Sequence, residues 1–280
     1  MAADVVITEY TDPACPWAFS AEPFRRRLSW LYGEQIEWEV CLVGLTDVGQ
    51  DAPYTPEQLS KAYKKISHDH KMPIDTRVRE RMAATVPACR AVVAARLNAS
   101  RERTRSLLRR LRVRTFSGEL LDAPETIDGA ARDAGIDPED LHHWVEDPAT
   151  QAALDEDMAA ARQPLPAARV LDAKLANWSG GRRYTCPSYE IERRADGVRI
   201  AVPGFQPFAV YDVITANLVP GLERRPAPAA VEEVLEWTGT PLASIEVAVV
   251  MDIPFEDARE QLGRVAVEQP VGFDGFWTLG

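Results

Sequence analysis

The order of strand and helix patterns in the first forty-five residues constrains the fold of this chain most strongly. Residues 5–7 are all β-branched, which is typical of a strand buried on both faces. A break at residues 12–16 follows, and apolar side chains then recur at helical spacing from residue 18 to Gly33. Residues 36–42 alternate between apolar and polar side chains, which is the period of a half-buried strand. A strand, a helix and a second strand in immediate succession indicate an α/β fold.

A helical block and a β-hairpin follow this unit. Residues 55–166 show no strand pattern, and a helix start is expected near each of Pro56, Thr76, Val86, Arg101, Pro124, Pro138 and Pro148. Strand patterns at 184–193 and 198–202 flank Ala195, Asp196 and Gly197, where the Asp-Gly pair is a strong hairpin signal. Residues 205–218 are again expected to be helical.

The last fifty-odd residues form a separate pattern after a linker at 224–229, which contains two prolines. Helices are expected at 231–237, 242–250 and 255–265, and a hairpin over 267–279 is expected to turn at Asp274 and Gly275. This order resembles a winged helix-turn-helix. Residues 227–280 hold ten acidic side chains against two arginines, so we do not expect this unit to bind DNA.

Charge and hydropathy exclude several classes of protein. The 280 residues carry 32 basic and 43 acidic side chains, a net charge of −11, which argues against a nucleic-acid or anionic-membrane partner. No apolar run approaches the ~20 residues of a membrane span, and the N-terminus lacks the pattern of a signal peptide. We therefore expect a cytoplasmic protein. Cysteines in that compartment stay reduced, so Cys15, Cys41, Cys89 and Cys186 are not expected to form a structural disulfide framework.

The segment DPACPWA at residues 12–18 is the sharpest chemical signal, because it lies where a buried strand feeds a helix. Pro16 suits the first helical position, which places Cys15 at the N-cap. The free N–H groups and the positive end of the helix dipole favour a thiolate there, whereas Asp12 opposes it if it lies close. Cys15 is therefore a candidate nucleophile, and a packed thiol is the alternative.

Taken together, these elements resemble the DsbA-like family of the thioredoxin fold over about residues 5–218, most closely its cytosolic FrnE-like branch. Kappa-class glutathione transferases and hydroxychromene-carboxylate isomerases are more distant. Further matching stretches are MPI at 72–74, PACRAV at 87–92, TCP at 185–187 and GFQP at 204–207. The resemblance implies a thioredoxin-like domain over residues 1–226 with a helical insertion at about 53–180. The acidic winged-helix-like domain expected from the element order then occupies residues 227–280.

The same resemblance assigns roles to individual residues. Cys15 matches the nucleophile, Trp17 the aromatic residue of the redox motif, and Pro187 the cis-proline that faces it. Four residues are expected to contact substrate: Pro16, Trp17, Thr185 and Gln206. Asp12, Ala18 and Cys89 are expected to lie behind the site.

Ala18 is a departure from the family pattern. Two-thiol relatives carry Cys-Pro-Trp-Cys, and their second cysteine resolves the mixed disulfide. Ala18 cannot do so, which leaves an external thiol, another cysteine, or a loss of dithiol chemistry.

Cys186 is the candidate for that other cysteine, although it lies 171 positions from Cys15. In proteins of this fold the residue before the cis-proline lies against the nucleophile, and it is usually Thr or Val. We hypothesise that Cys15 and Cys186 form a redox pair; the alternative is that Cys186 only fills space beside the proline.

Other polar clusters have simpler interpretations. His68, His70, His142 and His143 lack the spacing of metal ligands and are expected on the solvated surface, so we expect no metal site. Seven arginines lie between residues 101 and 114, and Leu107, Leu108 and Leu111 give that stretch an apolar edge. An exposed face of an amphipathic helix is the expected structure, and an anion-binding patch is the minority interpretation.

Three functions remain open. The first is a thiol-disulfide oxidoreductase that uses the Cys15 thiolate on protein or small-molecule substrates, resolved by Cys186 or by a low-molecular-weight thiol such as glutathione. The second is a non-catalytic adaptor of the same fold, such as the relatives that deliver regulatory proteins to a protease. The third is a glutathione-type transferase or isomerase. No other cofactor is expected, and a homodimer is one open arrangement.

Overall fold

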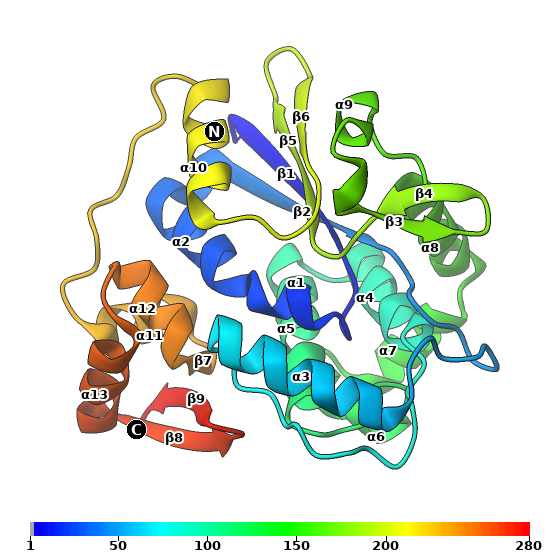
Figure 1. Cartoon of the computed structure of the whole chain (residues 1–280), viewed down its shortest axis with the longest axis horizontal. Helices are drawn as coiled ribbons and strands as arrows, with labels where there is room; N and C mark the ends of the chain where they lie inside the picture. The colour runs from blue at the N-terminus through cyan, green and yellow to red at the C-terminus, as the bar shows by residue number, and fades with distance from the viewer. Residues whose placement is uncertain (1–2) are drawn as a thin grey trace.

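The computed structural model describes residues 3–280, and its centre is a four-stranded sheet of order β2-β1-β5-β6 (Figure 1). Strand β1 (Val5–Thr11) runs parallel to β2 (Ile36–Leu42) and antiparallel to β5 (Ser188–Arg193), which pairs with β6 (Val198–Val202). Ile7 lies opposite both Trp38 and Ile191 in this register. The β1–helix–β2 unit and the hairpin predicted from the sequence therefore form one sheet.

The helix between β1 and β2 is interrupted, whereas the sequence predicted one continuous helix. It consists of α1 (Pro16–Ser20) and α2 (Glu22–Tyr32), separated at Ala21 and followed by the short 3-10 helix η1 (Gly33–Gln35). Pro23 lies in the first turn of α2, where its missing N–H cannot continue the hydrogen bonds of α1. Helix α2 and α10 (Phe208–Leu218) pack on one face of the sheet, around Leu28, Ile191 and Tyr211.

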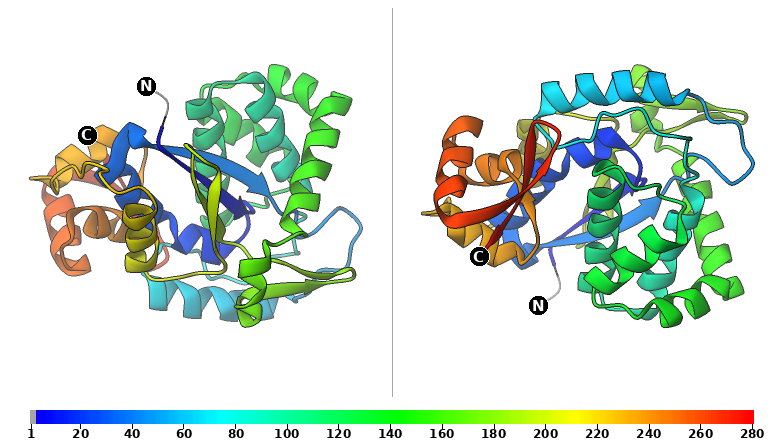
Figure 2. Two further views of the ribbon diagram at one scale, coloured as in Figure 1. Left: turned by 90° about the horizontal axis from the view of Figure 1, so that it is seen from above. Right: turned by 90° about the horizontal axis from the view of Figure 1, so that it is seen from below.

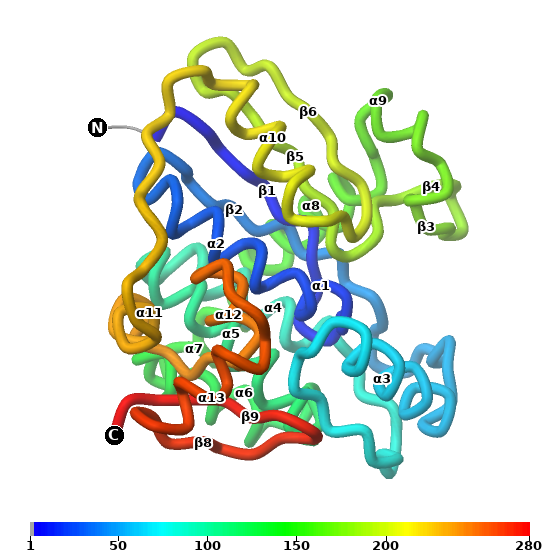
Figure 3. Tube along the Cα trace, turned by 60° about the vertical axis from the view of Figure 1, so that its left-hand side comes forward, coloured from blue at the N-terminus to red at the C-terminus, as the bar shows by residue number. Residues whose placement is uncertain are grey.

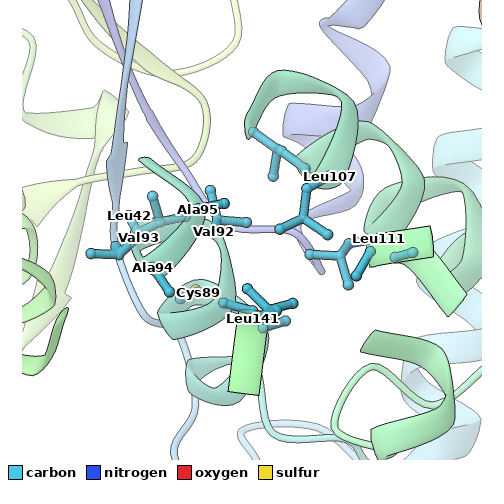
Figure 4. Close-up of a cluster of buried hydrophobic side chains, with 14 of the residues drawn as sticks. Leu42, Cys89, Val92, Val93, Ala94, Ala95, Leu107, Leu111 and Leu141 are labelled. Atoms are coloured by element: carbon cyan, nitrogen blue, oxygen red, sulfur yellow. The ribbon is translucent and has the colours of Figure 1, made fainter. Parts of the chain in front are cut away.

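The insertion between β2 and β5 is mainly helical. Its elements are α3 (Pro56–His70), α4 (Val86–Asn98), α5 (Arg101–Phe116), α6 (Pro124–Asp133), α7 (Pro138–Glu146), α8 (Pro148–Ala161), α9 (Pro166–Arg169), η2 (Asp172–Lys174), β3 (Leu175–Trp178) and β4 (Gly181–Tyr184). The core of the insertion surrounds α4, in which eight of thirteen residues are buried. Figure 4 shows α4 side chains meeting Leu42 of β2, Leu107 and Leu111 of α5, and Leu141 of α7.

Two parts of the insertion differ from the sequence prediction. The helix expected near Thr76 is absent, because α3 ends at the left-handed residue Lys71 and the next segment runs without helix to α4. Met72 and Ile74 of this irregular segment are both buried, in a cluster with Phe19 and Phe116, and that packing competes with helix formation. The β3–β4 hairpin was not predicted.

Residues after the linker form α11 (Val231–Thr238), β7 (Leu242–Ala243), α12 (Ser244–Met251), α13 (Phe255–Val265), β8 (Ala266–Val271) and β9 (Asp274–Leu279). The strands make a sheet of order β7-β9-β8, and β7 was not predicted. The hairpin turns at Gly272 and Phe273, not at Asp274 and Gly275, because Gly272 has a φ of +65° and lies against the backbone of Ile74. The domain division at residue 226 and the winged-helix likeness stay predictions.

This C-terminal unit lies beside α2, away from α7 and α8 (Figure 2). Part of the contact is aromatic. Phe19 of α1 stacks on Phe116 of α5, with ring centroids 4.5 Å apart, and also faces Phe276 of β9 at 6.4 Å. The short helix α1 is thereby held by both the insertion and the C-terminal unit.

A buried network of charges joins the same parts, which corrects the expectation that the arginine-rich helix is simply an exposed face. Arg112 is fully buried and donates hydrogen bonds to Glu9 of β1, at 2.9 Å, and to Glu22 of α2. Arg109 is also buried and pairs with Glu22 and, at 2.6 Å, with Glu246 of α12. Burial raises the pKa of Glu22, but the surrounding arginines outweigh it and hold that pKa well below its usual range.

Replacing a member of this network is expected to destabilise the protein strongly. Arg112→Met removes the fully buried cation that joins Glu9 to Glu22 and leaves Glu9 with only the longer 3.6 Å contact to Arg25, so we expect a cost of about 3–5 kcal/mol. The matched control is Arg101→Met. Arg101 is an exposed residue of the same helix, α5, and pairs with Glu37 of β2. Ion pairs at the protein surface contribute about 0–1 kcal/mol to stability. Urea unfolding measures both changes in the free energy of unfolding, and equal losses for the two variants would contradict this description.

Candidate active site

Cys15 lies at the carboxyl end of β1, as the N-cap of α1, with Pro16 as the first helical residue. This local structure follows from the sequence, because a proline at the first helical position loses no intrahelical hydrogen bond. The side chain is 6% exposed, so its sulfur meets solvent only through the cleft described below. The predicted N-cap position is confirmed.

Cys186 meets Cys15 from the opposite side of the site, on the segment that precedes β5. The Cys15 thiol donates a hydrogen bond of 3.2 Å to the backbone carbonyl of Cys186. The peptide bond between Cys186 and Pro187 is cis. The structure therefore brings together two cysteines that are 171 positions apart, both as free thiols.

The two thiols differ in acidity. A hydrogen bond from the Cys186 side chain, supported by the backbone amides of Ala18 and Trp17, lowers the pKa of Cys15 against the opposing effects of burial and the charge of Asp12. Burial raises the pKa of Cys186 well above its usual value, and the hydrogen bond and negative charge at Cys15 raise it further. Cys15 is therefore the more acidic thiol of the pair.

Asp12 lies behind this pair as a fully buried side chain with several donors. It accepts hydrogen bonds from the backbone N–H groups of Ala14 (2.9 Å) and Leu45 (3.0 Å), from the Thr85 hydroxyl (2.7 Å) and from the Cys89 thiol (3.4 Å). Burial, followed by the charge of Asp12, raises the pKa of Cys89 well above its usual value, so Cys89 stays a thiol. Sequence reasoning missed Thr85; its position just before α4 was the available signal.

A cleft of about 460 Å³ opens in front of the two cysteines. Helix α3, which packs against α1 (Figure 3), supplies an apolar wall that includes Tyr63 and Ile66. Arg79 and Arg183 line the same cleft and carry its positive charge. The guanidinium group of Arg79 lies over the Tyr63 ring, 5.6 Å from its centroid. Neither Arg79 nor Tyr63 was predicted from the sequence, because the fold brings both to the cleft from the insertion.

Trp17 stands at the rim of the cleft and is 41% exposed. Its ring meets His70 of α3 edge-on, with centroids 5.1 Å apart, and Phe205 at 5.7 Å. Burial lowers the pKa of His70, which favours the neutral ring in this aromatic group. The group fixes Trp17 beside the cleft while leaving one side of its indole open.

The predicted site residues divide into two sets. Cys15, Pro16, Trp17, Thr185 and Cys186 all line the cleft. Those absent from its lining are Asp12, Ala18, Cys89, Pro187 and Gln206. Ala18 is buried in the same apolar cluster as both cysteines. The Gln206 side chain donates a hydrogen bond of 2.9 Å to the backbone carbonyl of Pro203.

Residues 3–280 contain neither a cluster of metal-binding side chains nor a membrane-spanning helix. His, Cys, Asp and Glu side chains in this range form no group of three or more that could hold a metal ion. Nor does any helix there have the length and apolar character needed to cross a bilayer.

Comparison with curated proteins finds similarity along nearly the whole chain. The ClpXP adapter protein SpxH of Halalkalibacterium halodurans is 23% identical over 286 aligned residues, which cover 97% of this chain and 87% of SpxH. SpxH of Shouchella clausii is also 23% identical, with the same coverage of both chains.

Solved structures show the same fold. The cytosolic disulfide reductase DsbM from Pseudomonas aeruginosa matches with a TM-score of 0.56 at 15% identity, covering 76% of this chain and all of DsbM. A structure of DsbM with GSH matches with a TM-score of 0.50 at 15% identity, covering 76% of this chain and 95% of that one.

The profile of the DSBA-like thioredoxin domain matches residues 6–164, more than half of the chain and including the Cys15 motif. Together with the sheet order and the structural matches, this shows that the chain belongs to the DSBA-like thioredoxin domain family.

Proposed function

We propose that this protein is a thiol-disulfide oxidoreductase in which Cys15 is the nucleophile and Cys186 the resolving thiol. The observation that carries the proposal is the pairing of the two sulfurs: a helix N-cap cysteine with a lowered pKa, in a cleft, contacted by a second free cysteine. Thiolates, not thiols, attack disulfides, so the residue with the lowered pKa acts first.

The proposed reaction has two exchange steps. The Cys15 thiolate attacks one sulfur of a substrate disulfide, and the other sulfur leaves as a thiolate that takes up a proton. The Cys15 mixed disulfide carries no charge, so the negative charge that raised the pKa of Cys186 is gone. Cys186 can then lose its proton and attack the sulfur of Cys15, which releases the second substrate thiol. The substrate disulfide is reduced by two electrons, and the cysteine pair is oxidised to a disulfide.

The cleft supports a substrate with an apolar body and negative charge. Tyr63, Ile66 and Trp17 offer apolar surface, and Arg79 and Arg183 offer cations near the two cysteines. Glutathione, a small thiol with two carboxylates, matches the positive charge of Arg79 and Arg183, and DsbM, which shares the fold, has a structure with GSH. We therefore propose a low-molecular-weight thiol of the glutathione type as the reductant that reopens the Cys15–Cys186 disulfide.

Two substitutions at Cys186 separate its effect on acidity from its role in resolution. Cys186→Ser keeps a donor beside Cys15, so the pKa of Cys15 is expected to stay low. Cys186→Ala removes the donor, so the pKa of Cys15 is expected to rise and alkylation below that pKa to slow. The rate of Cys15 alkylation against pH measures both, in a Cys41→Ser background. An identical pH profile for the serine and alanine variants would refute the donor role of Cys186.

A second candidate, a protein-delivery adaptor, is favoured by one observation. The two SpxH relatives align over 97% of the chain, including the C-terminal unit, which lies outside the matched thioredoxin profile. As an adaptor, the chain would bind a protein partner and present it to a protease such as ClpXP, without a role for Cys15.

Partner capture in cell extract distinguishes the two candidates. Cys186→Ser blocks resolution, so the oxidoreductase proposal predicts partners that accumulate on Cys15, are released by dithiothreitol and are absent from the Cys15→Ala variant. Cys89→Ser serves as the matched cysteine control and is expected to behave as wild type. Partners retained equally by Cys15→Ala and resistant to dithiothreitol would reject the oxidoreductase proposal and support the adaptor.

A further inference from the structure

A second concave site lies on a different part of the molecule from the cysteine cleft. It is a groove of about 700 Å³ between α2, the first half of α5 and the end of α11, a volume typical of small-molecule sites. The lining contains six arginines: Arg25, Arg26, Arg103, Arg105, Arg109 and Arg110. We call this site the arginine groove. It is positive although the whole chain has a net charge of −11.

Most carboxylates of the arginine groove are already occupied. Glu22 is held in the buried network by Arg26, Arg109 and Arg112, and Asp133 pairs with Arg114 at 2.8 Å. Glu102 is the remaining acidic side chain of the lining. Three arginines of the lining have no ion-pair partner among residues 3–280: Arg103, Arg105 and Arg110. Their three positive charges exceed the single negative charge of Glu102. The groove therefore has an excess of uncompensated positive charge.

Buried donors without partners add an independent observation. The Nε atoms of Arg109 and Arg110 are both buried and have no hydrogen-bond acceptor in the structure. Arg109 as a whole is only 5% exposed, so an unsatisfied N–H there is costly. Partial desolvation within the groove, and after it the charge of Arg25, lowers the pKa of Arg105, so the site disfavours a cation that has no anion beside it. An anion in the groove would relieve both conditions.

The placement of the free arginines indicates the shape of that anion. Arg103 and Arg110 are seven residues apart on one edge of α5, about 10 Å along the helix at 1.5 Å per residue. Arg105 and Arg109 lie on the opposite edge of the face that lines the groove. A single compact charge cannot contact cations so far apart, whereas an ion with several linked anionic groups can. Guanidinium groups match phosphate oxygens in a bidentate geometry.

We propose that the arginine groove binds a small molecule or ion bearing two or more linked phosphate groups, held by Arg103, Arg105 and Arg110. Trp237 also lines the groove and is partly exposed, so it can contact an organic group of the ligand. This site is separate from the Cys15 cleft and makes no use of its thiols.

Calorimetric titration of the full chain with inorganic pyrophosphate, at about 0.15 M salt, tests the proposal. Wild type is expected to bind and to gain thermal stability, because the ligand binds only the folded state. Arg103→Ala/Arg110→Ala is expected to weaken binding at least tenfold, which corresponds to about 1.4 kcal/mol. The matched control, Arg169→Ala/Arg264→Ala, removes two exposed arginines outside the groove and is expected to bind as wild type.

Titrations with other ligands identify the class of ligand. ATP that binds at least tenfold more tightly than pyrophosphate assigns the groove to nucleotides, and equal affinity assigns it to the phosphate groups alone; both support the proposal. The single variant Arg105→Gln, on the exposed surface, gives the same test if the double variant folds poorly. The proposal is overturned by an absence of pyrophosphate binding at millimolar concentration, by unchanged binding in the variants, or by equal or tighter binding of citrate or an oligoglutamate peptide.

Discussion

The contact between Cys15 and Cys186 is the interaction on which the chemistry of this fold depends. Cys15 follows β1 and caps α1, Cys186 precedes β5, and β1 and β5 are neighbours in the sheet. Because these strands are paired, the two cysteines meet although the long insertion separates them in the sequence. The lowered pKa of Cys15 is a consequence of that meeting, whereas the raised pKa of Cys186 comes first from burial and then from the contact with Cys15.

The rest of the molecule keeps α1 in place. This helix is only five residues long, and Phe19 anchors it between Phe116 of α5 and Phe276 of β9. The buried network of Arg109, Arg112, Glu22 and Glu246 fixes the same parts through α2. The C-terminal unit is therefore part of the support for α1, the helix that Cys15 caps. A change in the packing of this unit is expected to alter the position of α1 and with it the position of the Cys15 thiol.

Local signals in the sequence predicted the parts of this structure that are determined locally. Pro16 at a strand–helix junction places Cys15 at the N-cap, and the Asp196-Gly197 pair marks the β5–β6 hairpin. The contact with Cys186 required the family resemblance, because nothing near residue 186 reveals its distant partner. Thr85 and Arg79 were missed for the same reason, since both reach the site from the insertion.

The sequence-based predictions that were wrong also have physical explanations. Helical periodicity cannot show that Arg109 and Arg112 face inward, because their carboxylate partners lie on β1, α2 and α12. The segment after Lys71 has residues that tolerate a helix, yet it is irregular, with Met72 and Ile74 buried against other elements. Tertiary contacts overrode the local pattern in both places.

The most direct test of the central claim is the disulfide map of the protein after mild oxidation with glutathione disulfide. Peptide mass mapping is expected to show one dominant intramolecular bond, between Cys15 and Cys186, with Cys41 and Cys89 still reduced. Oxidised protein in which Cys15 carries only glutathione, and is never joined to Cys186, would contradict the account.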